Sequence, residues 1–141
     1  MVNEVNYSDY GTEINLLTTE LNALADGSTS AFGPTYAQDT NKDQFFSFEL
    51  EVDFVSAPDD GGYCEVEVYV SKDGGTTYPT MPDRVFRIKV DAVTSAQVLP
   101  CRHDVTIPPG EIKVKLKNKS GQAFPATGSV LNGYPYNNEI Q

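Results

Sequence analysis

Cys101 and His103 are the first side chains to weigh as chemical groups, because a thiol beside an imidazole can form a nucleophile pair. Residues two positions apart on a β-strand point to the same face. Such a pair also needs an oxyanion hole and a group that orients the imidazole, but the chain has no G-x-S-x-G elbow or related motif. His103 is the single histidine, so a metal site of the usual kind lacks a second imidazole. We expect no enzyme activity, no cofactor and no metal, with His103 a strand residue.

Residues 39–43 read D-x-N-x-D, which is how a calcium-binding loop begins. Such a loop also needs a glycine at its sixth position and a bidentate glutamate at its twelfth. Gln44 and Leu50 stand at those two positions. The sequence therefore predicts a solvated loop here and not a calcium site.

Residues 71–78 read S-x-D-x-G-x-T-aromatic and resemble the Asp-box turn of sialidases and other β-proteins. Asp73 can accept hydrogen bonds from backbone N–H groups, while Gly74 and Gly75 can take up positive φ angles. In those proteins the motif braces a hairpin away from the chemistry. We expect a structural turn.

The elements that would position these groups are strands. Apolar and polar residues alternate from residue 44 onward, and a period of two places them on opposite faces of a strand. The strands are expected at 46–54, 63–70, 86–90, 98–107 with an interruption at Pro100, 112–117 and 130–131. Turn residues such as Asp59 to Gly62 and Pro108 to Gly110 separate them. Short strands of this kind predict an all-β, antiparallel sandwich or barrel.

The N-terminal region carries a different pattern. Ile14, Leu17, Leu21 and Leu24 follow a 3, 4, 3 spacing, and Gly27 stands where a C-capping residue would. We expect a short helix at residues 13–25.

The two ends of the chain lack periodicity. We expect a single domain, 1–141, with an N-terminal arm at 1–12, a sandwich with its leading helix at 13–131 and a tail at 132–141. Tyrosine and apolar side chains without periodicity suit a partner's groove better than a core. The candidate interface residues are Val2, Val5, Tyr7, Tyr10, Tyr134, Tyr136 and Ile140.

The chain of 141 residues has 10 basic and 20 acidic residues, a net charge of -10. That charge argues against nucleic acid as a partner, and the chain has no apolar run long enough for a membrane span and no visible signal peptide. An acidic ladder and a basic ladder follow the predicted strands: Glu49, Glu51, Asp53, Glu65 and Glu67, then Arg87, Lys89, Lys113, Lys115, Lys117 and Lys119. If the ladders share a face they would pair, and if they lie on different sheets the domain has an acidic and a basic side.

Composition and spacing leave two further questions open. Cys64 falls on an apolar strand face, where a small buried hydrophobe is expected, and whether it pairs with Cys101 depends on geometry. A carbohydrate-binding module would use exposed aromatic platforms, which the absence of Trp disfavours and the 8 Tyr allow.

Residues 14–27 and 107–128 together resemble small structural proteins of tailed bacteriophages. The shared features of the second segment are Pro-Pro-Gly, a Lys-alternating strand, Lys-Asn-Lys-Ser-Gly and Phe-Pro-Ala-Thr-Gly, and residues 70–79 fit the middle of the same pattern. The resemblance implies a virion protein with a β-sandwich of jelly-roll type, made in the host bacterial cytoplasm. It implies a capsid decoration (cement) protein, bound as a trimer to the major capsid protein lattice and to neighbouring copies. The alternatives are a tail or neck component and a surface module that binds host glycan.

Overall fold

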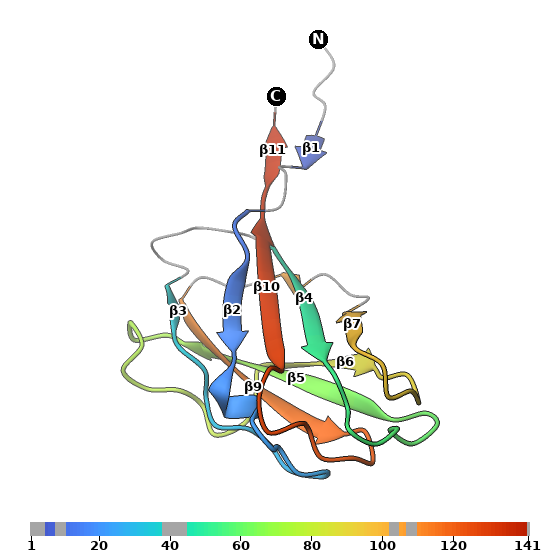
Figure 1. The fold of residues 1–141 in the computed structure, drawn as a ribbon. Coiled ribbons are helices and arrows are strands. Elements are labelled where there is room, and N and C mark those ends of the chain that lie inside the picture. Colours follow the sequence, from blue (N-terminus) through green and yellow to red (C-terminus); the bar gives the residue numbers. More distant parts are fainter. Residues whose placement is uncertain (1–4, 8–10, 38–44, 102–104, 107–109, 141) are drawn as a thin grey trace.

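The computed structural model describes residues 5–7, 11–37, 45–101, 105–106 and 110–140, which form a β-sandwich with a short ribbon at one end (Figure 1). One 3-10 turn, η1 (Thr19–Leu21), is the helical element of this part. The strands are β1 (Val5–Tyr7), β2 (Ile14–Leu17), β3 (Tyr36–Ala37), β4 (Phe45–Val52), β5 (Tyr63–Ser71), β6 (Arg84–Lys89), β7 (Gln97–Pro100), β8 (Val105–Thr106), β9 (Glu111–Lys119), β10 (Val130–Tyr136) and β11 (Asn138–Ile140).

The strands of the sandwich pair as a nested series. One sheet has the order β2-β10-β4-β7, with β8 also on β4, and the other has the order β3-β9-β5-β6. All these pairings are antiparallel. The first strand of the sandwich thus pairs with the last, the second with the next to last, and so on inward, which is the connectivity of a jelly roll. The predicted all-β antiparallel sandwich is confirmed.

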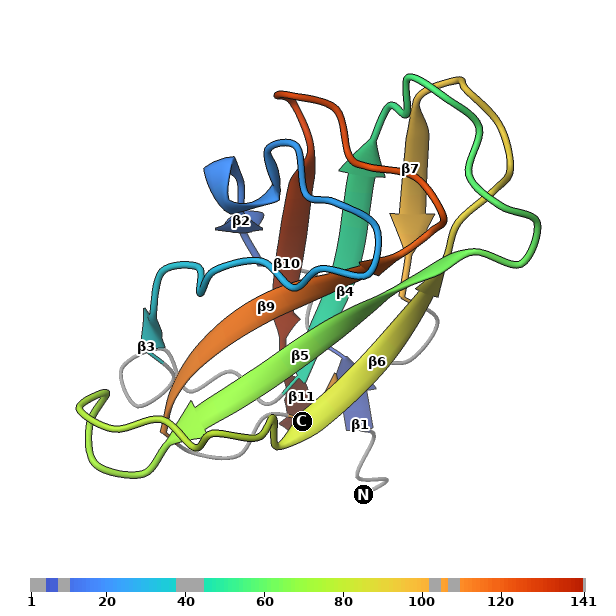
Figure 2. The ribbon, with the colours of Figure 1, turned by 90° about the horizontal axis from the view of Figure 1, so that it is seen from below.

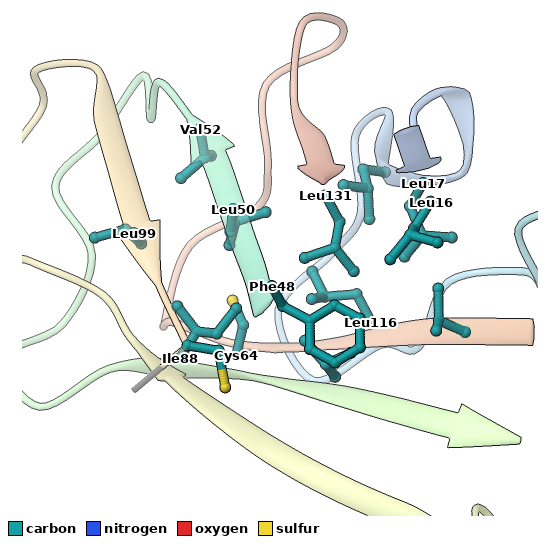
Figure 3. Close-up of a cluster of buried hydrophobic side chains, with 14 of the residues drawn as sticks. Leu16, Leu17, Phe48, Leu50, Val52, Cys64, Ile88, Leu99, Leu116 and Leu131 are labelled. Atoms are coloured by element: carbon teal, nitrogen blue, oxygen red, sulfur yellow. The ribbon is translucent and has the colours of Figure 1, made fainter. Parts of the chain in front are cut away.

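The core lies between the two sheets, whose strands cross at an angle (Figure 2). Alternate residues of each long strand point inward, as their period of two predicts. Phe48 and Leu50 from one sheet meet Cys64, Ile88 and Leu116 from the other (Figure 3). All five are buried, and burying a side chain of the size of Leu or Phe stabilises the fold by about 1.5–3 kcal/mol.

The helix expected at residues 13–25 is wrong. This stretch forms β2 and the single turn η1, because β2 pairs with β10 and aligns Leu17 with Leu131. Ala23 then takes a left-handed φ of 51° and donates its backbone N–H to the Pro125 carbonyl at 2.9 Å, which a continuous helix forbids. The spacing of the leucines would bury them in a helix as well as in the observed strand and turn. Pairing with β10 selects the strand.

The tail expected at 132–141 is also wrong in its first half. β10 is an inner strand that pairs with β4 at all of its positions, from Val130 to Tyr136. Gly133 breaks the alternation because a Cβ there would lie 2.8 Å from Leu16 Cδ1. Pro135 has no backbone N–H to donate, and it lies beyond the last pair with β2, which joins Gly133 to Ile14. Its carbonyl accepts the Gly11 N–H at 2.7 Å.

Pro100 marks an edge, as its place in the sequence predicts. β7 ends at Pro100, and both β7 and the short β8 pair with β4. The strand expected at 98–107 is therefore two short strands along one neighbour.

In the sheet with the order β3-β9-β5-β6, the segment before β3 covers the free edge of β9. This segment runs along β9 (Figure 2), with the Ser30 N–H donating to the Leu116 carbonyl at 2.8 Å and the Gly33 N–H to the Val114 carbonyl at 3.1 Å. Covering an edge in this way satisfies backbone groups that would otherwise invite pairing with another chain.

Candidate functional site

The two ends of the chain meet in a ribbon. β1 and β11 pair antiparallel, with Val5 opposite Ile140 and Tyr7 opposite Asn138. The ribbon projects beyond the end of β10, so both termini lie at the same end of the sandwich (Figure 1). It forms a sheet of only two strands in the described part of the chain. A ribbon this short is marginal by itself in water, and its outer edges can accept a further strand.

Three of the seven predicted interface residues, Val5, Tyr7 and Ile140, belong to this ribbon. Val2 and Tyr10 lie outside the described residues. The structure thus joins the N-terminal arm and the last part of the tail into one projection, which no local pattern in the sequence indicates.

The placement of Tyr134 and Tyr136 in a tail without periodicity is wrong. Both belong to β10. Tyr136 is buried, and Tyr134 is half-buried on the outer face of its sheet. The Tyr134 hydroxyl lies 2.7 Å from Glu13 Oε2 and 3.3 Å from Glu49 Oε1. These carboxylates, Glu13 first, raise the pKa of the Tyr134 hydroxyl.

The Asp-box segment forms the structural turn that its sequence predicts. Asp73 Oδ1 accepts the Ser71 hydroxyl at 2.6 Å and the Thr77 N–H at 2.8 Å. Gly74 and Gly75 take φ angles of 72° and 88°. The hydrogen bond from Ser71, followed by that from Thr77, lowers the pKa of Asp73 to about 2.

A hollow of about 300 Å³ lies beside this turn, with Asp73 and Asp83 in its wall. Both carboxylates are already engaged, since Asp83 Oδ2 accepts the Val70 N–H at 2.9 Å. The two acidic groups in the wall of the hollow therefore accept hydrogen bonds from backbone N–H groups of the turn region.

The thiols are structural in this arrangement. Cys64 and Cys101 are both buried and are not joined by a disulfide, which answers the open question of their pairing. Burial raises the pKa of the Cys64 thiol to about 12, so it is protonated at neutral pH. His103 and the calcium-like residues 39–43 lie outside the described residues. In the part that is described, no three His, Cys, Asp or Glu side chains gather as metal ligands would.

The two charge ladders are divided between the sheets. Glu49 and Glu51 lie on β4 in one sheet, whereas Glu65 and Glu67 lie on β5 in the other. β5 runs between the two basic strands, β9 and β6, and Glu65 faces Lys117 on one side and Arg87 on the other. Glu65 and Glu67 on β5 therefore share a face with basic residues, whereas Glu49 and Glu51 on β4 lie on a separate sheet.

Two residues that the sequence analysis overlooked complete these surfaces. Glu13 accepts the Tyr134 hydroxyl, and Phe32 lies over the β9 lysines, 4.2 Å from its ring centroid to Lys115 Nζ. Each contact joins residues that are far apart in the sequence, so no local pattern indicates it.

One structural finding and two comparisons with known proteins bear on identity. No helix among the described residues is long and apolar enough to cross a membrane. The chain matches no family model, and no curated protein is similar to it in sequence. The geometry of the ribbon and of the sheet faces is therefore the basis for assigning a function.

Proposed function

We propose that this protein is a structural component of a tailed-phage virion, a capsid decoration protein that stabilises the head. The observation that carries the proposal is the ribbon of β1 and β11, which projects from one end of the sandwich and offers open strand edges. A partner such as the major capsid protein can add a strand to an edge of this kind, with main-chain hydrogen bonds supplying affinity.

The ribbon is suited to this task because its two strands already pair with each other. An arm that is ordered before it docks loses less conformational entropy on binding than a free tail does. Neighbouring copies on a repeating lattice also raise each other's effective concentration, so that individually weak contacts suffice.

The jelly roll agrees with the proposal without deciding it. Viral capsid proteins and lectins both use this architecture, and a fold by itself does not define a function. A tail or neck component would use the same ribbon at a different place in the particle, and copy number distinguishes the two locations.

Mass spectrometry of purified particles tests the proposal through that copy number. We expect many copies per particle on the capsid surface, in a number that reflects the lattice. A few copies confined to the tail would refute the decoration role and favour the tail alternative. Absence from purified particles would refute a virion role altogether.

A pair of truncations tests the ribbon itself. Removing residues 1–10 deletes β1 but keeps Gly11 and its bond to Pro135, so the sandwich should stay folded by circular dichroism. Occupancy on particles should fall well below that of the full chain. The matched control lacks residues 1–4 only and retains β1, so its occupancy should exceed that of the protein without residues 1–10. Equal occupancy of both truncated proteins would remove the ribbon from the mechanism.

A further inference from the structure

The outer faces of the two sheets carry opposite charge. The acidic face is the outer side of the sheet that contains β4, and the described residues that give it its charge include Glu13, Glu49 and Glu51. The described strands of that sheet, β2, β4, β7, β8 and β10, contain no lysine or arginine. Within these described strands, the carboxylates therefore have no lysine or arginine beside them.

The basic face is the outer side of the other sheet. Its residues are Lys113, Lys115, Lys117 and Lys119 on β9 and Arg87 and Lys89 on β6, with Glu65, Glu67 and Glu111 as their acidic neighbours. Among the described residues, the one ion pair within 4 Å joins Arg87 Nε to Glu65 Oε1 at 3.6 Å. None of the four β9 lysines is therefore in an ion pair within 4 Å with a described residue.

Aromatic side chains lie against two of these lysines, Lys113 and Lys115. Lys115 Nζ lies 4.2 Å from the Phe32 ring centroid, and Lys113 Nζ lies 4.6 Å from that of Tyr78. Phe32 packs edge-on against Tyr69, with their centroids 4.9 Å apart. A cation over a ring keeps N–H groups free for an anion, and a side chain that is already ordered loses less entropy on binding.

The acidic face is ordered in a similar way. Tyr134 has one hydroxyl proton for two carboxylates, Glu13 and Glu49, which it holds close together. Like charges held together in this way favour the approach of a cation. Each face also exposes a valine, Val98 opposite Glu51 and Val85 opposite Glu67, whose burial would accompany docking.

We propose that the basic face of one copy docks on the acidic face of a second copy. The occupant is inferred from charge complementarity, because the acidic face has the sign and the ordered carboxylates that the β9 lysines require. The inference deepens the proposed function, since it names the surfaces through which neighbouring copies meet.

The geometry also predicts the form of the association. The two faces lie on opposite sides of the sandwich, so each contact is heterologous and extends into a row instead of closing into a compact ring. Exposed ion pairs contribute only about 0–1 kcal/mol each, so the row is weak in dilute solution and sensitive to salt.

Sedimentation velocity of the purified protein with two charge-reversed variants tests the proposal. Lys113→Glu/Lys115→Glu gives a copy with two acidic faces, and Glu49→Lys/Glu51→Lys gives a copy with two basic faces. Wild-type protein should associate at about 0.01 M salt and dissociate at about 1 M, where the Debye length falls from about 30 Å to 3 Å. Each variant alone should stay monomeric, and an equimolar mixture of the two should associate.

Two controls make the result specific. Asp60→Lys/Asp91→Lys changes the net charge by the same amount as the acidic-face variant, but at exposed loop positions, and should associate as the wild type does. Glu51→Lys alone leaves the contact between Tyr134 and Glu49 in place and replaces the double variant if that variant does not fold.

A monomeric wild type at low salt, a monomeric mixture, or a closed trimer that persists in high salt would each overturn the docking of these faces. These outcomes concern association in solution, whereas the proposed function is tested by the copy number on particles. The two proposals can therefore fail separately.

Discussion

Asn118 offers the sharpest test of how this fold is held together, because a single buried amide joins three segments of the chain. Its side chain is fully buried on β9. The amide nitrogen donates to the Leu24 carbonyl at 3.0 Å and to the Gln122 carbonyl at 2.7 Å. The amide oxygen accepts the Ser120 N–H at 3.0 Å and the Ser120 hydroxyl at 2.7 Å. Replacing Asn118 by alanine removes all of these bonds.

The cost depends on which partners keep another bond. The Leu24 carbonyl also accepts the Phe124 N–H, and the Gln122 carbonyl lies 2.9 Å from the Ser120 hydroxyl, which can donate to it once the Asn118 oxygen is gone. The Ser120 N–H has no second acceptor among the bonds described and is left unsatisfied in the interior, which costs about 1–3 kcal/mol. The two lost amide donations add about 1 kcal/mol each. We expect Asn118→Ala to lower the free energy of unfolding by about 3–5 kcal/mol.

Urea denaturation followed by circular dichroism measures this loss, with Ser120→Ala as the matched control. The control removes one hydroxyl from the same cluster and should cost about 1 kcal/mol. The denaturant dependence of the unfolding free energy should be unchanged in both variants, since the same surface is exposed on unfolding. A loss below about 1 kcal/mol for Asn118→Ala, or equal losses for both, would refute the reasoning.

Three further predictions follow from local contacts. Gly33→Ala places a Cβ against the Leu16 carbonyl oxygen and should lower the free energy of unfolding by about 1–3 kcal/mol in a thermal or urea melt, so an unchanged midpoint would contradict the close approach. Asp73 has its pKa lowered from 3.8 to about 2 in the fold, so its ionised form stabilises the fold above about pH 4, and this contribution disappears as the pH falls toward 2. Asp73→Asn should therefore be less stable than the wild type at pH 7 and converge with it near pH 2, and a difference independent of pH would show that the charge is irrelevant. Cys64 and Cys101 should react with a chromogenic disulfide only in denaturant, and fast labelling of the folded protein at pH 8 would show that the thiols are accessible.

The central strands and the braced turn were predictable from the sequence for a physical reason. β4, β5, β6 and β9 each have one buried and one exposed face, and this difference is written directly into alternating residues such as Phe46 and Ser47. The Asp-box turn depends on contacts within a few residues of Asp73, so the local sequence contains the whole arrangement.

The remaining features depend on pairing between distant segments, which no local pattern encodes. The spacing of Leu17 and Leu21 suits a helix, but β10 supplies hydrogen bonds for a strand at that place. Sequence spacing could show that the acidic and basic ladders exist, yet only the strand order placed β5 between two basic strands and β4 in the other sheet. The ribbon also depends on distant pairing, because Val5 and Ile140 come from opposite ends of the chain and are neighbours in a fold whose strands β2 and β10 pair with each other.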